Sequence, residues 1–260
     1  MLARDFPFLD RRFVAMAHRG GWATPEDEPR ENTSYAFGRA VGMGYRYIET
    51  DVRTTSDGHA VVFHDAELDR VTDAAGRIGD HNLAQLRAVR IAGLDQVPLL
   101  SEVLEEFPGT CFNIDLKDDG AAAAVAGVLR DQACAGRVCV SSFSGSRMRA
   151  FRRLAPPVPT GVSPVGVVLA GFVPVVRRLR LDRGEVFQIP ARVAGGRVPL
   201  VRPDVVKLAH STGRAVHVWT VDDTAEMERL VALGVDGLIS NDLTALKQVL
   251  TGHGLWEDAA

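Results

Sequence analysis

Short apolar segments alternate with longer amphipathic segments along most of the chain. The apolar segments, such as Val138 to Ser142, are rich in residues like valine, isoleucine and phenylalanine, which is typical of strands buried on both faces. The segments between them carry apolar residues at helical spacing and often end at a glycine, such as Gly213 or Gly234. Strands that alternate with helices in this way predict a parallel sheet covered by helices.

The number of strand–helix units favours a closed (β/α)8 TIM barrel over an open doubly wound sheet. No Gly-x-Gly-x-x-Gly sequence follows the first strand, which also weakens a dinucleotide-binding interpretation. The predicted strands lie at residues 13–17, around Glu49, around Phe63, and at residues 112–116, 138–142, 160–162, 186–189, 216–220 and 237–240. This set has one strand more than a barrel needs. Because the turn at Asp57-Gly58 joins two of these strands closely, we expect the barrel to be irregular there.

The predicted helices account for the amphipathic segments, and one polar segment stands apart from the alternation. The helices are expected at residues 35–44, 101–107, 121–134, 146–154, 167–179, 203–212, 224–233 and 243–250. Residues 66–97, after the third strand, are polar and rich in turn signals, so they predict a small insertion with little core of its own. Residues 1–260 are therefore expected to form a single barrel domain that carries this insertion.

Composition narrows the class of protein without changing the expected fold. The chain has 260 residues and a formal net charge of -3, which argues against a nucleic-acid partner. Its three cysteines lack metal-ligand spacing and are expected as free thiols in a reducing compartment. No signal peptide or membrane span is expected, because the nearest candidate, Val165 to Val176, is interrupted by glycines and a proline. We therefore predict a cytoplasmic protein, and its oligomeric state stays open.

Chemically active side chains gather where the predicted strands end, which is the active face of a TIM barrel. They are His18, Arg19, Glu49, Asp51, His64, Asp65, Asp115, Lys117, Ser142, Gln188 and Trp219. Glu49 and Asp51 stand two apart on one strand, as Asp115 and Lys117 do on another, so each pair faces one side of its strand. Charged groups that face a barrel interior are costly unless they are paired or bind a ligand.

The chemistry of these groups indicates a bound cation and a phosphate. The three carboxylates of Glu49, Asp51 and Asp115 suit one hard divalent cation, Mg²⁺ or Ca²⁺, with Mn²⁺ as a further candidate. Arg19 and Lys117 beside that cation suit a phosphate group. Two histidines at separate strand ends can act as acid and base near neutral pH. Together these groups predict cleavage of a phosphodiester.

The motifs that contain these residues resemble those of the glycerophosphodiester phosphodiesterase family, whose members share a phospholipase-C-like barrel. The matching motifs are His18-Arg19-Gly20, Glu31-Asn32-Thr33, Glu49-Thr50-Asp51-Val52, Thr55-Ser56-Asp57-Gly58 through His64-Asp65, Asp115-Leu116-Lys117, Ser142-Phe143, Val218-Trp219-Thr220-Val221 and Gly234 to Ile239. They run in order along nearly the whole chain, so the match is specific. The resemblance implies that His18 and His64 are the catalytic pair and that Glu49, Asp51 and Asp115 hold the metal ion.

The chain departs from the family's motifs at three places. The third metal acid is Asp115, one methylene shorter than the family's glutamate, so we expect a small change in metal position. The family's Pro-Glu-Asn-Thr is here Pro29-Arg30-Glu31-Asn32-Thr33, with one extra residue. Its Thr-Asp near the end of the last strand is here Ser240-Asn241-Asp242. We expect that the extra residue in the second motif and the changed residues in the third do not affect the proposed chemistry.

Several residues have a structural interpretation beside a functional one. Arg19 is expected both as a phosphate ligand and as an ion-pair partner of Glu31, which would orient it. Asn32 is either a supporting residue of the site or a helix cap. Trp219 is either a core aromatic or a wall of the substrate pocket. The weaker candidates are Ser142 and Gln188 as pocket residues, and His59, His81, His210, His217 and His253 as surface or packing histidines.

The resemblance implies metal-dependent hydrolysis of a small glycerophosphodiester to glycerol 3-phosphate and an alcohol. A lysophospholipase D or related lipid phosphodiesterase is an alternative, because Val165 to Val176 lies next to a basic cluster that suits a membrane surface. A helix that covers the barrel gives the same pattern. A non-catalytic barrel that only binds phosphate compounds is a third hypothesis, which the presence of every expected histidine and acid disfavours. The identities of the metal, the alcohol and the basic histidine stay open.

Overall fold

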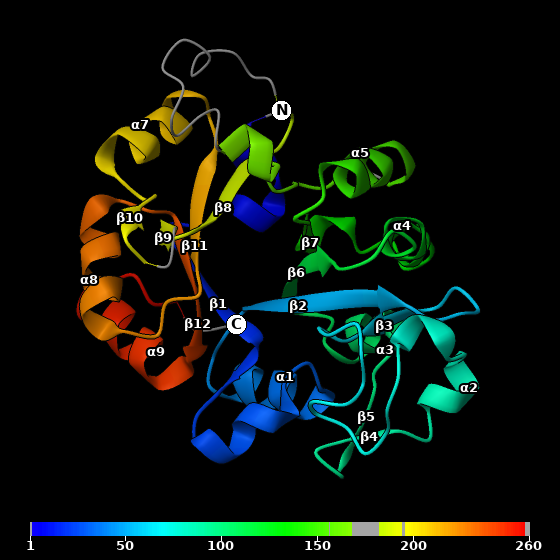
Figure 1. The fold of residues 1–260 in the computed structure, drawn as a ribbon. Coiled ribbons are helices and arrows are strands. Elements are labelled where there is room, and N and C mark those ends of the chain that lie inside the picture. The colour runs from blue at the N-terminus through cyan, green and yellow to red at the C-terminus, as the bar shows by residue number, and fades with distance from the viewer. Residues whose placement is uncertain (1, 156, 168–181, 194–195, 258–260) are drawn as a thin grey trace.

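The computed structural model describes residues 2–155, 157–167, 182–193 and 196–257, which form a barrel of parallel strands surrounded by helices (Figure 1). Its sheet follows the order β7-β6-β2-β1-β12-β11-β8, and each neighbouring pair is parallel. These strands are β1 Val14–Trp22, β2 Tyr47–Thr54, β6 Cys111–Leu116, β7 Val138–Ser141, β8 Val186–Pro190, β11 Ala215–Trp219 and β12 Gly237–Asp242. The expected TIM barrel is confirmed.

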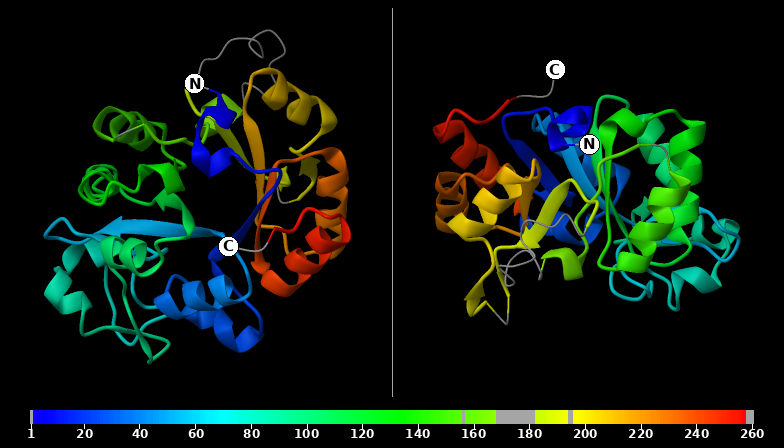
Figure 2. Two further views of the ribbon diagram at one scale, coloured as in Figure 1. Left: turned by 180° about the vertical axis from the view of Figure 1, so that it is seen from behind. Right: turned by 90° about the horizontal axis from the view of Figure 1, so that it is seen from above.

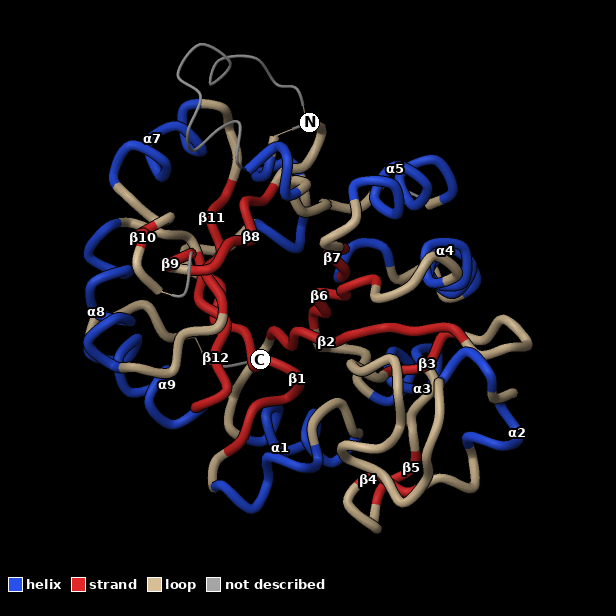
Figure 3. Tube along the Cα trace, viewed as in Figure 1, coloured by secondary structure: helices blue, strands red, loops and turns tan. Residues whose placement is uncertain are grey.

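Two residues close the ring of strands between β7 and β8. Thr160 pairs with Val140 and Gly161 pairs with Val186, so the strand expected at residues 160–162 is reduced to two parallel bridges. The surplus extended segment is β3 (Ala60–Val62), which pairs antiparallel with the end of β2 and lies outside the ring (Figure 3). The irregularity expected beside the Asp57-Gly58 turn is therefore a hairpin arm that projects from the barrel.

The helices lie outside the ring of strands (Figure 2). They are α1 Ser34–Gly42, α3 Leu100–Glu106, α4 Ala121–Asp131, α5 Gly145–Leu154, α7 Pro203–Ser211, α8 Thr224–Leu233 and α9 Leu243–Gly252. Two of them begin at an aspartate cap: Asp223, after β11, and Asp242, the last residue of β12, accept hydrogen bonds from the first turns of α8 and α9. The helix expected at 167–179, and with it most of Val165 to Val176, falls on residues 168–181, outside the described part. None of the described helices is long and apolar enough to cross a membrane.

The barrel interior is filled from its amino-terminal end, where the strands begin. Two short 3-10 helices, η1 (Ala3–Asp5) and η2 (Pro7–Leu9), precede β1, and Phe8 enters the interior beside Tyr47, with ring centroids 5.1 Å apart. The Tyr47 hydroxyl also donates a hydrogen bond to the Phe8 carbonyl at 3.0 Å. The other buried residues of this interior cluster are Val14, Met16, Cys111, Cys139, Val186 and Ile239. The carboxyl-terminal end of the barrel is left for polar side chains.

The insertion at residues 66–97 has a hydrophobic core, contrary to the expectation from the sequence. It contains η4 (Ile78–Asp80), α2 (Leu83–Leu86), β4 (Arg90–Ile91) and β5 (Asp95–Gln96). Its buried apolar residues pack against Val61 and Phe63 of the β3 arm. Those residues are Leu68, Ile78, Leu86, Val89, Ile91 and Val97. They stand singly among turn residues and show no helical or strand period, so the sequence pattern did not reveal that they share one cluster.

Candidate active site

A cavity of about 160 Å³ opens at the carboxyl-terminal ends of the strands, where TIM barrels place their reactive groups. It is lined by His18, Arg19, Glu49, Asp51, His64, Asn113, Asp115, Lys117, Ser141, Phe143, Gln188, Trp219, Thr220 and Ile239. The register of the sheet explains this convergence: His18 lies beside Glu49, and Asp51 lies beside Asp115 on the next strand. The structure therefore brings together both predicted histidines, the three predicted acids and the two predicted cations.

Asp51 lies at the centre of the charged groups and is 1% exposed. Its carboxylate contacts Arg19 Nε at 3.1 Å and Lys117 Nζ at 2.9 Å, and it accepts a hydrogen bond from Asn32 Nδ2 at 2.9 Å. Burial raises the pKa of Asp51, but the charges of Lys117 and Arg19 outweigh burial and hold the pKa below its usual value. Asp51 is therefore ionised near neutral pH.

Glu49 is buried but lacks a comparable set of partners. Among the described residues, its side chain accepts one hydrogen bond, from the backbone N–H of Arg19 at 3.2 Å, and Oε2 lies 3.8 Å from His18 Nε2. Burial and the charge of Asp51 raise the pKa of Glu49 well above its usual value. A cation placed beside Glu49 would reverse both effects, so this carboxyl group fits a cation site.

Lys117 bridges two of the predicted metal acids. Its Nζ lies 2.6 Å from Asp115 Oδ2 and 2.9 Å from Asp51 Oδ1. Burial lowers the pKa of Lys117, but Asp51 and Asp115 outweigh burial and raise it to about 12. Burial also raises the pKa of Asp115. The ammonium group thus takes the position between two carboxylates where a bound cation would lie.

No group of three acidic, histidine or cysteine side chains stands at metal-binding geometry in the described part of the chain. The donor chemistry nevertheless fits a hard cation, because the cavity holds the carboxylates of Glu49, Asp51 and Asp115 and one of them has no countercharge in direct contact. The Lys117 ammonium contacts both Asp51 and Asp115, so it would compete with a cation for these two carboxylates.

Two residues with left-handed backbone hold the guanidinium side of the cavity. Arg19 has φ 54° and Asn32 has φ 58°, and the Asn32 N–H donates to the Arg19 carbonyl at 2.9 Å. Arginine is rarely found in this region, and such strain is typical of functional sites. Glu31 accepts from Arg19 Nη1 at 3.1 Å, so the expected ion pair is present. Asn32 supports Asp51, whereas Thr33 is the residue that caps α1.

The two histidines have different hydrogen-bond partners. His18 Nδ1 lies 2.6 Å from Asn241 Oδ1, a neutral amide. His64 Nδ1 lies 2.6 Å from Asp65 Oδ1, a carboxylate. Burial and the Arg19 charge lower the pKa of His18 below its usual value, so this ring is neutral near pH 7. The two rings therefore differ in the group that holds Nδ1, an amide at His18 and a carboxylate at His64.

Comparison with known proteins identifies the family to which the chain belongs. The Glycerophosphoryl diester phosphodiesterase family matches residues 18–245. The chain is 34% identical over 252 residues to "Probable glycerophosphodiester phosphodiesterase 2" of Mycobacterium tuberculosis. The aligned residues cover 95% of this chain and 94% of that protein. The chain belongs to the glycerophosphoryl diester phosphodiesterase family. Members of this family are phosphoric diester hydrolases.

Solved structures agree with this membership at the level of the fold. A glycerophosphodiester phosphodiesterase from Agrobacterium tumefaciens superposes with a TM-score of 0.72 at 25% identity, and covers 92% of this chain and 100% of that one. A phosphodiesterase from Oleispira antarctica, in complex with its product sn-glycerol-3-phosphate, has a TM-score of 0.75 at 22% identity. It covers 92% of this chain and 96% of that one. The barrel is therefore the family's fold.

Other contacts of this phosphodiesterase-family site were missed from the sequence. Asn241 was expected not to touch the chemistry, yet its side chain contacts His18. Arg70, in the insertion, contacts both Asp65 and Glu31, so it links the His64 and Arg19 sides of the site. Both contacts join segments far apart in sequence, and no periodic pattern signals them. The other cavity residues missed were Asn113, Ser141, Phe143, Thr220 and Ile239.

The weaker pocket candidates divide between the catalytic cavity and its surroundings. Gln188 lines the catalytic cavity, where its Nε2 donates to Asn113 Oδ1 at 2.6 Å. Trp219 also lines it and packs edge-on against Phe143, with ring centroids 5.5 Å apart. Ser142 instead donates a hydrogen bond to the Leu116 carbonyl at 2.7 Å. It lines a second cavity, which adjoins the first. Trp219 is therefore a pocket wall, whereas Ser142 has a structural bond.

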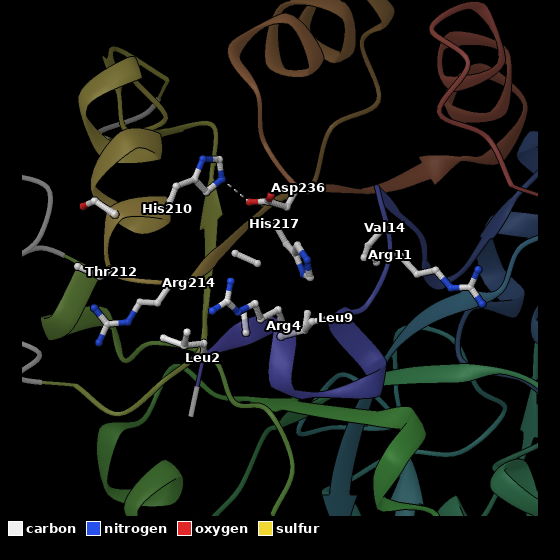
Figure 4. A pocket seen from close by; sticks show the side chains of 14 residues that line it. Leu2, Arg4, Leu9, Arg11, Val14, His210, Thr212, Arg214, His217 and Asp236 are labelled. Atoms are coloured by element: carbon white, nitrogen blue, oxygen red, sulfur yellow. Dashed lines mark hydrogen bonds and ion pairs between the residues drawn. The ribbon is translucent and has the colours of Figure 1, made fainter.

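A larger cavity, of about 730 Å³, lies at the opposite end of the barrel, where the strands begin (Figure 4). His210 Nε2 and Asp236 Oδ2 lie 2.8 Å apart beside it. His217 belongs to its wall but is 0% exposed, and its ring nitrogens have no hydrogen-bond partner among the described residues. Gly237 makes room for this ring, because a Cβ there would lie 2.9 Å from His217 Cδ2. His217 is thus a packing histidine, as expected, and is not presented to a ligand.

Replacement of His217 with leucine should reduce the acid sensitivity of unfolding. Burial lowers the pKa of His217 from 6.5 to about 4, so the folded protein keeps the ring neutral while the unfolded chain takes up a proton. Because the folded pKa is depressed, this contribution to stability is complete above pH 6.5 and is lost as the pH falls toward 4. The full loss is about 3 kcal/mol. Urea unfolding of both proteins at about pH 7.5 and about pH 4.5 measures it, and an equal pH dependence would contradict the assignment.

Proposed function

We propose that the protein is a cytoplasmic, divalent-cation-dependent phosphodiesterase that hydrolyses a glycerophosphodiester to glycerol 3-phosphate and an alcohol. The observation that carries this proposal is the pairing of His18 with an amide and of His64 with a carboxylate at one cavity. The same cavity holds two cationic side chains and three carboxyl groups. Family membership supports the substrate class. The complete set of charged and titratable groups argues against a barrel that only binds phosphate compounds.

Arg19 and Lys117 bind and orient the phosphate group of the substrate in this mechanism. His18 Nε2 takes the proton from the attacking hydroxyl, that of water or of the substrate's glycerol, as its oxygen bonds to phosphorus. The bond between phosphorus and the alcohol oxygen then breaks, and His64 donates a proton to that oxygen. If water attacks, the product is glycerol 3-phosphate; if the glycerol hydroxyl attacks, the product is a cyclic glycerol phosphate, and water must then add to phosphorus and break one ring P–O bond to give glycerol 3-phosphate. The contact between His64 Nδ1 and Asp65 Oδ1 at 2.6 Å holds the ring in place, with Nε2 as the other ring nitrogen.

The residues that would hold the cation are Glu49, Asp51 and Asp115. Mg²⁺ or Ca²⁺ suits their oxygen ligands, and Mn²⁺ is a further candidate. When bound, such a cation neutralises charge on the phosphate oxygens and on the buried carboxylates. The raised pKa of Glu49 supports this assignment, because burial and the charge of Asp51 outweigh the charges of Lys117 and Arg19 and make ionisation of that side chain costly.

A panel of glycerophosphodiesters tests the function directly. Glycerophosphocholine, glycerophosphoethanolamine and glycerophosphoglycerol should each be assayed for release of glycerol 3-phosphate, with EDTA and with added Mg²⁺, Ca²⁺ or Mn²⁺. We expect release with at least one substrate, loss of release with EDTA and recovery with one cation. Absence of release with every substrate and cation would contradict the proposed function, and release that resists EDTA would contradict its cation dependence alone.

Replacement of Lys117 with methionine should tighten divalent-cation binding. The Lys117 ammonium contacts Asp51 and Asp115, so it competes with a cation for the same carboxylates. We expect cation affinity to rise by about 10-fold, since removal of one positive charge at this distance is worth at least 1 kcal/mol. Calorimetric titration with Mg²⁺ and Mn²⁺ measures the change. Lys207→Met, at an exposed position of α7, is the matched control, and weaker binding in the Lys117 variant would contradict the competition.

An apolar cavity beside the site favours lipid substrates as a second candidate function. It measures about 200 Å³, adjoins the catalytic cavity at Asp115, Gln188 and Trp219, and is otherwise mostly apolar. Its apolar lining includes Phe143, Val162, Val167, Ile189, Val193 and Leu200. An acyl chain on the leaving alcohol would fit such a lining, as a lysophospholipase D requires. Comparison of kcat/KM for lysophosphatidylcholine and glycerophosphocholine separates the two substrate classes.

A further inference from the structure

A chain of hydrogen bonds connects His18 to a carboxylate outside the catalytic cavity. His18 Nδ1 lies 2.6 Å from Asn241 Oδ1. Asn241 Nδ2 in turn donates to Asp222 Oδ2 at 2.7 Å. His18 lies within β1, Asn241 lies near the end of β12, and Asp222 follows β11; these strands are neighbours in the barrel. The chain of bonds therefore links three adjacent strands, and it does not include any of the acids assigned to the cation.

Asp222 fixes the orientation of the Asn241 amide. A carboxylate accepts hydrogen bonds and cannot donate them, so the amide NH₂ of Asn241 must face Asp222. The amide oxygen must then face His18. Asp222 is itself held by the Asn241 backbone N–H at 2.7 Å and by the Ser240 hydroxyl at 2.9 Å. One bond from Nδ2 thus orients the amide, and two further bonds fix the carboxylate that accepts it.

The orientation of the amide selects one tautomer of the neutral imidazole. Because the Asn241 amide oxygen is an acceptor, His18 Nδ1 must carry the ring proton. The lone pair then lies on Nε2, the nitrogen that lies 3.8 Å from Glu49 Oε2 in the cavity. The opposite tautomer would carry a proton on Nε2 and could not take another from an attacking hydroxyl.

We infer that Asn241, held by Asp222, is a positioning residue that keeps His18 in the tautomer required of a general base, an inference that rests on the proposed function. The bond that breaks in this step is the O–H bond of the attacking hydroxyl, and the bond that forms is Nε2–H. Asn241 does not touch the substrate; it acts through His18.

An amide suits this position better than a carboxylate for an electrostatic reason. The cavity already contains Glu49, Asp51 and Asp115, and Glu49 lies within 3.8 Å of the His18 ring. A fourth carboxylate in direct contact with His18 would favour the protonated ring, which cannot act as a base. The neutral amide orients the ring without adding that charge, and the carboxylate of Asp222 stays one residue further away.

The decisive experiment compares the tautomer of His18 in the wild type and in Asn241→Leu. Two-bond ¹H–¹⁵N correlation spectra, recorded where the rings are neutral, distinguish a protonated Nδ1 from a protonated Nε2. We expect the Nδ1–H form in the wild type and a mixture richer in Nε2–H in the variant. We also expect kcat to fall by about 10²-fold or more, as when a catalytic imidazole loses its orienting partner, with KM within a few-fold of wild type.

Two further variants separate positioning from a structural defect. The exchange Asn241→Asp with Asp222→Asn keeps an acceptor at His18 and a donor behind it, so it should recover the Nδ1–H form and part of kcat. Asp223→Asn is the matched control, because Asp223 caps α8 and asparagine is an equally good cap. We expect no change of tautomer or kcat in that control.

The spectra and kinetics of Asn241→Leu test the positioning role of Asn241, whereas hydrolysis by the wild type tests the proposed function. If His18 keeps the same tautomer in Asn241→Leu, the positioning role of Asn241 is wrong, even if kcat falls, because the fall in kcat then has a structural cause. A changed tautomer with kcat within about threefold of wild type overturns it as well, since orientation then has no catalytic consequence. If the wild type hydrolyses no glycerophosphodiester, the proposed function fails and the general-base role fails with it, while the spectra still report which tautomer Asn241 selects.

Discussion

Alanine in place of His64 is expected to lower turnover of a glycerophosphodiester by about 10²–10⁴-fold, the usual range for a positioned proton donor. In the proposed mechanism His64 is the acid, so its loss leaves the departing alkoxide without a proton. A p-nitrophenyl phosphodiester has a leaving group that needs no proton, so turnover of that substrate should be nearly normal in His64→Ala. Steady-state kinetics with both substrates measures the difference.

His18→Ala is the companion of that variant and should behave differently. Its loss should lower turnover of both substrates by about 10²–10⁴-fold, because each needs the attacking hydroxyl to lose a proton. The base must be deprotonated, and the pKa of His18 is lowered, so wild-type activity should fall as the pH drops below 6.5 through that lowered pKa. This acidic limb should disappear in His18→Ala. Rescue of His18→Ala by the p-nitrophenyl substrate, instead of His64→Ala, would reverse the two roles.

Asp51→Asn is expected to abolish cation-dependent activity, a loss of at least about 10³-fold. Asp51 is 1% exposed, and its charge offsets those of Arg19 and Lys117. The amide keeps the shape of the side chain but removes one of three carboxylates that suit the cation. It also leaves two partly buried cations without their common partner, so stability should fall by about 1–3 kcal/mol.

Activity against Mg²⁺ concentration, together with calorimetric cation titration, measures the effect of Asp51→Asn. Asp119→Asn is a matched control, because its side chain is 89% exposed and contacts Arg147 outside the cavity. Circular dichroism at the assay temperature shows whether each variant is folded. Normal turnover and normal EDTA sensitivity in folded Asp51→Asn would place the cation elsewhere.

The insertion contributes more to the site than its polar sequence indicates. Arg70 connects Asp65, the partner of His64, with Glu31, the partner of Arg19. The hydrophobic core of residues 66–97 fixes the segment from which Arg70 extends. The insertion thus contacts the partners of both His64 and Arg19 at the cavity.

Local sequence determined the strands, most of the helices and the side of each strand on which the reactive groups lie. Glu49 and Asp51 share one side of β2 because side chains alternate along a strand, and the same holds for Asp115 and Lys117 near the end of β6. The parallel register then brought these pairs together at one end of the barrel. Each of these properties depends on near neighbours in sequence or on a general rule of the fold.

Tertiary structure decided the partners of the reactive groups. Asn241 and His18 are 223 residues apart, and Arg70 lies 39 residues from Glu31, so neither contact follows from spacing along the chain. The antiparallel pairing of β3 and the insertion core likewise depend on which surfaces meet after the chain folds. The physical reason is that short-range patterns set backbone periodicity, whereas hydrogen bonds and ion pairs between distant segments exist only once the barrel closes.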